Sequence, residues 1–247
     1  MHLDVQELRS FYYRSTLGRG AQASIRMRLL ELWPEANGQT VAGFGFAVPA
    51  LRPYLPQARR MIALMPAQQG VIAWPPGLPN KSVLTEETQW PIETGHIDKL
   101  LVMHGLEGSE HPSQLLDECW RVLGPGGRAI FIVPSRGGLW SRNDATPFGH
   151  GQPYTPGQLE TLLRQHRFVP ERHAAALYQP PSSRRFWLKS RTVFERLGRR
   201  LPSVVAGGVV MIEVSKRVQA PTGTGVKELA RRPARALKGV KGVTRPA

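Results

Sequence analysis

Three places in the sequence combine residue types that can bind a ligand or move a proton. Gly43 and Gly45 end the short apolar run 40–47, and a Gly-x-Gly turn lets the backbone approach a ligand closely, although a tight turn in any α/β fold has the same pattern. His104 follows a second apolar run, 97–103. Histidine titrates near neutral pH, so His104 is a candidate general base, with a packing role as the alternative.

The third place is the loop 134–151 and its approach to Tyr154, which is long for a connection inside a compact domain. Loops of this length are commonly functional. Its His150 is a second candidate catalytic residue. The other notable side chains suit a pocket for an anionic or aromatic substrate, or else a solvated lid packed by two aromatic rings: Trp140, Arg142, Asn143, Asp144 and Phe148.

Alternating strand and helix patterns position these residues. Short apolar runs predict strands at 40–47, 61–64, 71–74, 82–84, 97–103, 128–133 and 209–214. Helical spacing predicts helices over 4–33 with a break at Gly18 and Gly20, over 48–55, over 112–123 and from 155 onward. The glycine-rich stretch 124–127 predicts a turn. This alternation favours an α/β fold with a parallel sheet.

The composition narrows the class of protein. The chain has 247 residues, enough for one large domain with appendages, and a single cysteine. Cys119 therefore cannot form an internal disulfide, and its place on the apolar face of a helix predicts core packing rather than a nucleophilic role. No metal site is evident. With no signal peptide and no apolar run long enough to span a membrane, we expect a cytoplasmic protein.

The net charge of +15 is concentrated in two segments. Residues 216–247 hold nine lysines and arginines against one acid, and their lack of large apolar residues predicts a disordered basic tail. Residues 184–200 hold seven against one acid, with apolar residues at roughly helical spacing, which predicts an inserted basic helix. These segments make a nucleic-acid partner an open alternative. We expect a helical cap over 1–37 and the main domain over 38–215.

The stretch 86–134 resembles the core of the class I S-adenosylmethionine (SAM)-dependent methyltransferases, in the small-molecule type 11-like subgroup. The matching motifs occur in the family's order and spacing: Glu86, Trp90-Pro91, Ile97-Asp98, His104-Gly105-Leu106-Glu107 and Cys119 to Gly127. The helix entry 153–159 continues the pattern. The resemblance covers roughly residues 38–180, and the run 209–214 extends it.

The resemblance implies a doubly wound, mostly parallel, seven-stranded sheet with its last strand antiparallel and helices on both faces. Such a sheet binds nucleoside-like ligands at the carboxyl ends of its strands. It also implies a SAM cofactor whose carboxylate meets the helix start after the first strand, and whose adenine amino group is reached by Glu86. The implied cofactor residues are Gly43, Phe44, Gly45, Ala47, Leu64, Met65, Glu86, Glu87 and His104.

The sequence departs from the family pattern at two acids, which are replaced by Val41 and, approximately, Leu64. A carboxylate that grips the ribose hydroxyls contributes about 1.5–3 kcal/mol, so its loss weakens SAM binding about tenfold to a hundredfold. We favour a SAM-dependent methyltransferase that acts on an unidentified small molecule. The alternatives are a catalytically degenerate regulatory or scaffold protein, which predicts a filled pocket beside Gly43 and Gly45, and an RNA-directed methyltransferase that uses the basic segments.

Overall fold

The structure is a computed structural model that describes residues 3–182 and 207–217. The basic helix predicted at 184–200 lies outside the described residues, as does the tail beyond residue 217. Within the described ranges, no helix has the length and apolar character needed to cross a membrane.

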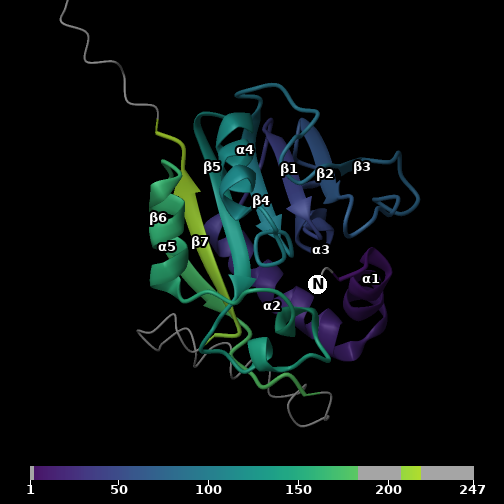
Figure 1. Ribbon diagram of the computed structural model, residues 1–247. Helices are drawn as coiled ribbons and strands as arrows, with labels where there is room; N and C mark the ends of the chain where they lie inside the picture. The colour runs from purple at the N-terminus through teal and green to yellow at the C-terminus, as the bar shows by residue number, and fades with distance from the viewer. Residues whose placement is uncertain (1–2, 183–206, 218–247) are drawn as a thin grey trace, which may run out of the picture.

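A seven-stranded sheet forms the centre of the molecule (Figure 1), with the strand order β3-β2-β1-β4-β5-β7-β6. The first five strands run parallel, and β7 is antiparallel to both of its neighbours. The predicted fold class is therefore confirmed. The strands are β1 (Thr40–Gly45), β2 (Arg60–Pro66), β3 (Ser82–Thr85), β4 (Ile97–Met103), β5 (Leu123–Pro134), β6 (Val169–Ala176) and β7 (Val209–Ser215).

Helices cover both faces of the sheet and bury a hydrophobic core on each side. Of the α-helices in the described part of the chain, the first three pack on one face and the other two on the opposite face, as Figure 1 shows. They are α1 (Val5–Arg14), α2 (Thr16–Leu32), α3 (Val48–Leu51), α4 (Pro112–Val122) and α5 (Pro156–Gln165). The described ranges also contain three short 3₁₀ helices: η1 (Arg52–Tyr54), η2 (Trp140–Arg142) and η3 (Pro147–Gly149). The strand order reverses between β1 and β4, and ligands of doubly wound sheets bind at such a switch point.

The first two helices separate at Ser15, so the predicted break at Gly18 and Gly20 is wrong. The Ser15 hydroxyl accepts a hydrogen bond from the amide of Gly18 at 2.8 Å and caps α2. An added Cβ at Gly18 would lie 1.9 Å from the carbonyl oxygen of Phe11. Gly18 therefore lets the two helices approach each other closely, rather than ending one of them.

Three further segments differ from the sequence-based predictions. Residues 71–74 form no strand, and a cis peptide bond joins Trp74 to Pro75. Residues 124–127 lie within the irregular start of β5, where the pairing register with β4 shifts, so they are not a separate turn. Strand β6 had no apolar run to signal it, because its first half is polar and partly exposed.

Cys119 is fully buried on α4, as its position on the apolar face predicted. Burial is the largest cause that raises the pKa of its thiol well above the ordinary value. We expect a water-soluble thiol reagent to leave Cys119 unlabelled in the native protein and to label it fully in denaturant. Mass spectrometry of the labelled protein checks this, and rapid native labelling would contradict the buried position.

Candidate active site at the switch point

The glycine turn after β1 packs tightly against its own chain. Gly45 has a φ of +78°, and an added Cβ there would lie 2.4 Å from the carbonyl oxygen of Met103. At Gly43 an added Cβ would lie 2.5 Å from the Cδ1 atom of Leu51. Close approach of neighbouring segments therefore requires both glycines, and a bound ligand is not needed to explain them.

The helix after this turn is short. α3 has four residues, and Pro49 in its first turn has no amide hydrogen to donate. Ala47 precedes it in a helical conformation without a side-chain cap. Few free backbone amides are therefore available at the start of α3 for the cofactor carboxylate that the resemblance implies there.

The two positions that lack the family's acids are in the protein interior. Val41 and Met65 are buried in the core beneath α1, α2 and α3. Leu64 is buried in the core on the opposite face, beneath α4 and α5. Apolar packing has thus replaced the carboxylates, and no other acid takes their place at these positions in β1 and β2.

The adenine side of the implied site is more open. A hollow of about 400 Å³ lies at the ends of β2 and β3, and Thr85, Glu86 and Gln89 are among its lining residues. The Glu86 side chain is exposed there. Glu87 is buried instead and accepts a hydrogen bond from the hydroxyl of Ser109, so Glu86 is the accessible acid of the two.

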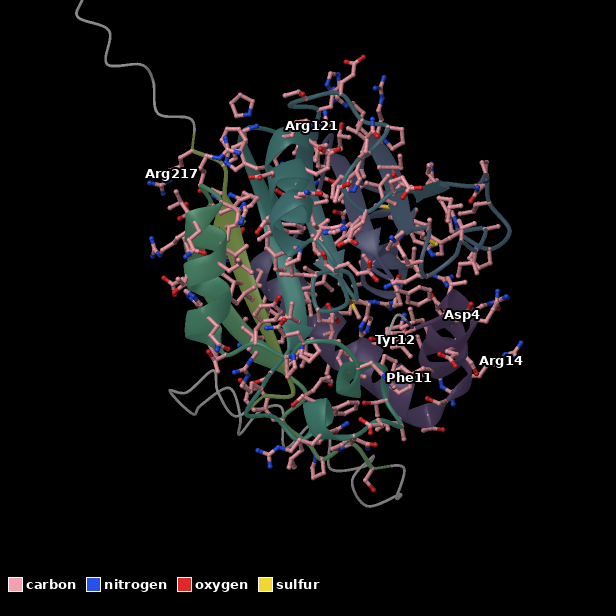
Figure 2. The ribbon with its side chains drawn as sticks, viewed as in Figure 1. Asp4, Phe11, Tyr12, Arg14, Arg121 and Arg217 are labelled. Carbon is pink, nitrogen blue, oxygen red and sulfur yellow. The ribbon has the colours of Figure 1, made fainter. Side chains whose placement is uncertain are left out.

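A chain of three buried polar side chains lies at the carboxyl end of β4. The Tyr12 hydroxyl from α1 is 2.6 Å from Nε2 of His104. Nδ1 of His104 is 3.0 Å from Oε1 of Glu107. Figure 2 shows Tyr12 on the side of α1 that faces the end of the sheet, whereas Arg14 projects from the outer side. His104 holds a φ of +52°, a left-handed conformation that is uncommon for residues other than glycine.

The direction of these hydrogen bonds follows from the chemistry of the groups. Burial, reinforced by the negative charge of Glu107, raises the pKa of Tyr12 well above its ordinary value, so its hydroxyl stays protonated and can donate. An ionised carboxylate only accepts, so Nδ1 of His104 carries a hydrogen toward Glu107. Nε2 of a neutral His104 then accepts from Tyr12. The second oxygen of Glu107, Oε2, is buried without a hydrogen-bond partner among the described residues.

Aromatic rings enclose this chain. The Tyr12 ring stacks on Phe46 with a centroid separation of 5.9 Å, and Phe148 lies 4.9 Å from the His104 ring. Trp140 packs edge-on against Phe148 at 5.5 Å. The inner part of the implied cofactor site is filled by these side chains in this arrangement.

The two large rings of the loop after β5 are part of this packing. Trp140 is fully buried and its indole nitrogen donates to the carbonyl oxygen of Gln179 at 2.7 Å. Phe148 is 2% exposed. Both rings therefore pack the loop against the domain. For Trp140 and Phe148 this agrees with the alternative of a packed lid and not with that of an open pocket.

The other predicted loop residues lie nearer the surface. Arg142 is exposed, and the Asn143 amide donates to the carbonyl oxygen of Pro181. Nε2 of His150 is 2.9 Å from the carbonyl oxygen of Asp144. His150 and His104, the two candidate catalytic histidines, line the same small cavity.

The residues present fit SAM only in part. The hollow beside Glu86 suits a purine ring and its amino group. The position expected to hold the ribose hydroxyls, Leu64, is apolar and buried, and Phe46 and Tyr12 fill the space beyond the glycine turn. The part of the chain that the structure describes contains no cluster of three or more His, Cys, Asp or Glu placed to hold a metal ion.

Two residues of the polar chain were missing from the predicted site. Tyr12 has a spacing typical of a core position on an amphipathic helix, so no local pattern indicated its role. Glu107 lies three residues after His104, and an acid at this spacing from a histidine could have indicated that the two side chains interact. Its significance depends on the turn at His104, which brings the two side chains together.

Comparison with known proteins confirms the resemblance. Residues 43–131 match the family model described as a methyltransferase domain. No curated protein sequence matches the chain.

Several solved structures share the fold at low sequence identity. A SAM-dependent methyltransferase from Archaeoglobus fulgidus is 16% identical, with 86% of this chain and 100% of that chain covered and a TM-score of 0.59. A SAM-dependent methyltransferase from Thermotoga maritima, described as a possible histamine N-methyltransferase, is 17% identical, with coverages of 86% and 96% and a TM-score of 0.56. The [4+2]-cyclase SpnF is 17% identical, with coverages of 78% and 81% and a TM-score of 0.51.

Proposed function

We propose that this chain, which has the fold and the sequence core of the class I SAM-dependent methyltransferases, transfers a methyl group to a small-molecule acceptor. The observation that carries the proposal is the buried chain of Tyr12, His104 and Glu107 at the switch point of the sheet. Burying three hydrogen-bonding side chains costs stability that apolar packing would not, and such costs are commonly retained at functional sites.

The protein itself does not have to activate the methyl group. Bound SAM supplies a methyl group already activated by its sulfonium, so the protein has to position an acceptor and take up its proton. Glu86 is the residue placed to hold the purine end of the cofactor.

His104 is the group that can accept the proton. Glu107 holds the imidazole through Nδ1, which leaves Nε2 as the basic atom. The Tyr12 hydroxyl is hydrogen-bonded to Nε2 of His104, so an acceptor must displace this hydroxyl to reach Nε2. Because Tyr12 belongs to α1, the helix or at least this side chain has to move when the acceptor binds. The same helix, with Phe148, excludes water from the imidazole.

Isothermal titration calorimetry with SAM and with its demethylated product tests the cofactor. We expect saturable binding with a dissociation constant weaker than about 10 μM, because a lost ribose carboxylate costs about tenfold to a hundredfold in affinity. Glu86→Ala should weaken binding further. Glu93→Gln, at an exposed residue that does not line the hollow, is the matched control. Absence of saturable binding at millimolar ligand would overturn the proposal.

A second candidate is a non-enzymatic or otherwise non-methylating protein on the same fold. The tight packing at Gly43 and Gly45 and the buried apolar residues at the acid positions favour it. The similarity to a [4+2]-cyclase is consistent with such a change of activity on this fold. The titration separates the two candidates, because only the first requires SAM to bind.

A further inference from the structure

We infer that the groove between α1 and the loop after β5 binds a small organic cation, namely an arylalkylamine whose ammonium group pairs with Glu107. The inference rests on the proposed function and deepens it, because it assigns the chemical class of the acceptor. Only the neutral amine has a nitrogen lone pair that can take the methyl group, so the bound ammonium group first gives a proton to Nε2 of His104, which lines the same cavity as Glu107. It gives Glu107 a ligand-binding role that neither the sequence motifs nor the similar proteins assign to it.

The groove has a volume of about 710 Å³ and is built from two segments far apart in the sequence. Leu3, Phe11 and Ser15 are among its lining residues from α1 and its flanks. Thr146 and Pro147 are among those from the loop after β5. The half-buried ring of Phe11 and the apolar side chains give the groove a surface suited to a hydrocarbon or aromatic body.

A smaller cavity continues the groove toward the polar chain. It measures about 20 Å³ and lies against His104 and Glu107. Leu3, Pro147 and His150 line both the groove and the cavity, so the two are adjacent. A volume of this size accommodates about one water-sized group. An ammonium group is of that size, whereas a carboxylate or a ring is larger.

Glu107 supplies the specific partner. Its side chain is 5% exposed, and its Oε2 atom has no hydrogen-bond partner among the described residues. A buried carboxylate oxygen without a donor is costly, and a donor with positive charge relieves that cost most effectively. Because Oε1 already accepts from His104, an incoming ammonium group would pair with Oε2 without disturbing the imidazole.

The charges around the groove point to the same class of ligand. Glu7 on α1 and Asp144 on the loop are exposed lining residues, and neither forms an ion pair with another described residue. Among the described residues that line the groove, Arg14 is the one lysine or arginine, and its side chain is exposed. Counting Glu107 of the adjoining cavity, three carboxylates face one guanidinium among these described lining residues, which favours a cation over an anion.

Three probes of one size test the inference: phenethylamine, 2-phenylethanol and 3-phenylpropionate, which present a cation, a neutral group and an anion on the same ring. Binding is measured by isothermal titration calorimetry on the full chain, without SAM. We expect phenethylamine to bind at least tenfold more tightly than either other probe. Equal affinities, or preference for the anion, would overturn the inference.

Two sets of variants locate the binding site. Glu107→Gln should weaken phenethylamine binding at least tenfold, with its thermal melting curve recorded to verify folding. The exposed double variant Glu7→Gln/Asp144→Asn should weaken binding about threefold and reduce its dependence on salt, and it does not rely on a buried substitution. Glu93→Gln is the control and should bind as the natural sequence does. Unchanged affinity in both test variants would refute the assigned site.

The outcome stays distinguishable from that of the proposed function. If phenethylamine binds as expected while SAM does not, the cation site stands and the methyltransferase proposal fails. If SAM binds and no probe prefers the cationic form, the acceptor class is wrong and the methyltransferase proposal stands.

Discussion

Gly45→Ala is expected to lower the free energy of unfolding by about 4 kcal/mol, because it combines two separate penalties. At a φ of +78° an alanine is strained by about 1–2 kcal/mol. Its Cβ would also lie 2.4 Å from the carbonyl oxygen of Met103, so β1 and β4 would have to separate. Overpacking of this kind costs about 1–3 kcal/mol. The expected fall in Tm is about 10 °C for a chain of this size.

Alanine substitutions at three other glycines distinguish the cost of backbone strain from the cost of steric overlap. Gly126 has a φ of +73° but open space around it, and Gly105 has ordinary φ but would place a Cβ 2.7 Å from the Phe44 ring. Gly157 has neither feature. We expect alanine at Gly126 and at Gly105 to cost about 1–3 kcal/mol each, and alanine at Gly157 to change stability by less than about 0.5 kcal/mol. Thermal or urea unfolding measures all four. A Gly45 variant as stable as the Gly157 variant would contradict the close packing.

Much of the sheet could be predicted because its strands are buried on both faces. The continuous apolar runs of β1, β4 and β7 are visible in the sequence for that reason. Strand β6 lies at the edge, where only its last three residues are fully buried, and its sequence therefore has no apolar run. The break between α1 and α2 was misplaced because glycine can end a helix or allow two helices to touch, and only the packing decides between these.

The part of the site that lies within one continuous segment of the sequence could be predicted. The family pattern placed His104 at the end of β4, and the structure has it there. Its hydrogen-bond partner Tyr12 is 92 residues away along the chain, and no local pattern connects them. The types of the loop rings Trp140 and Phe148 left a substrate pocket and a packed lid as alternatives, and burial against Gly208 and Tyr12 decides their place. Side-chain type shows what a residue can do, whereas its packing determines whether a ligand can reach it.

A buried carboxylate on the sheet face that α2 covers holds several elements together. Glu213 on β7 is fully buried and accepts a hydrogen bond from the indole nitrogen of Trp33 at 2.9 Å. It also pairs with Arg128 of β5 at 3.1 Å and with Arg172 of β6 at 2.5 Å. The Arg172 guanidinium in turn donates to the carbonyl oxygen of Leu32 at the end of α2. Glu213 therefore links three strands to the helical layer.

Burial alone would raise the pKa of Glu213, but the hydrogen bonds from Arg172, Trp33 and Arg128 outweigh it, and the pKa is lowered. A carboxyl group whose pKa is lower in the folded state stabilises the fold above its unfolded pKa. That contribution is lost as the pH falls through the folded pKa. The stabilisation is thus complete at neutral pH and disappears in acid.

Glu213→Gln is accordingly expected to lower the free energy of unfolding at pH 7 by about 3 kcal/mol, because two charge-assisted pairs are lost from a buried position. The arginine side chains remain about half exposed and regain water, which limits the cost. The corresponding fall in Tm is about 6–12 °C. Glu93→Gln, which removes an 83% exposed partner of His96, should change stability by less than about 0.5 kcal/mol.

Melting curves between pH 7 and pH 3 provide the decisive comparison. The natural sequence should lose stability faster than Glu213→Gln as the pH falls below about 4, so the difference between the two proteins should shrink toward zero in acid. A difference that stayed constant with pH would show that Glu213 stabilises the fold through its shape and packing rather than its charge.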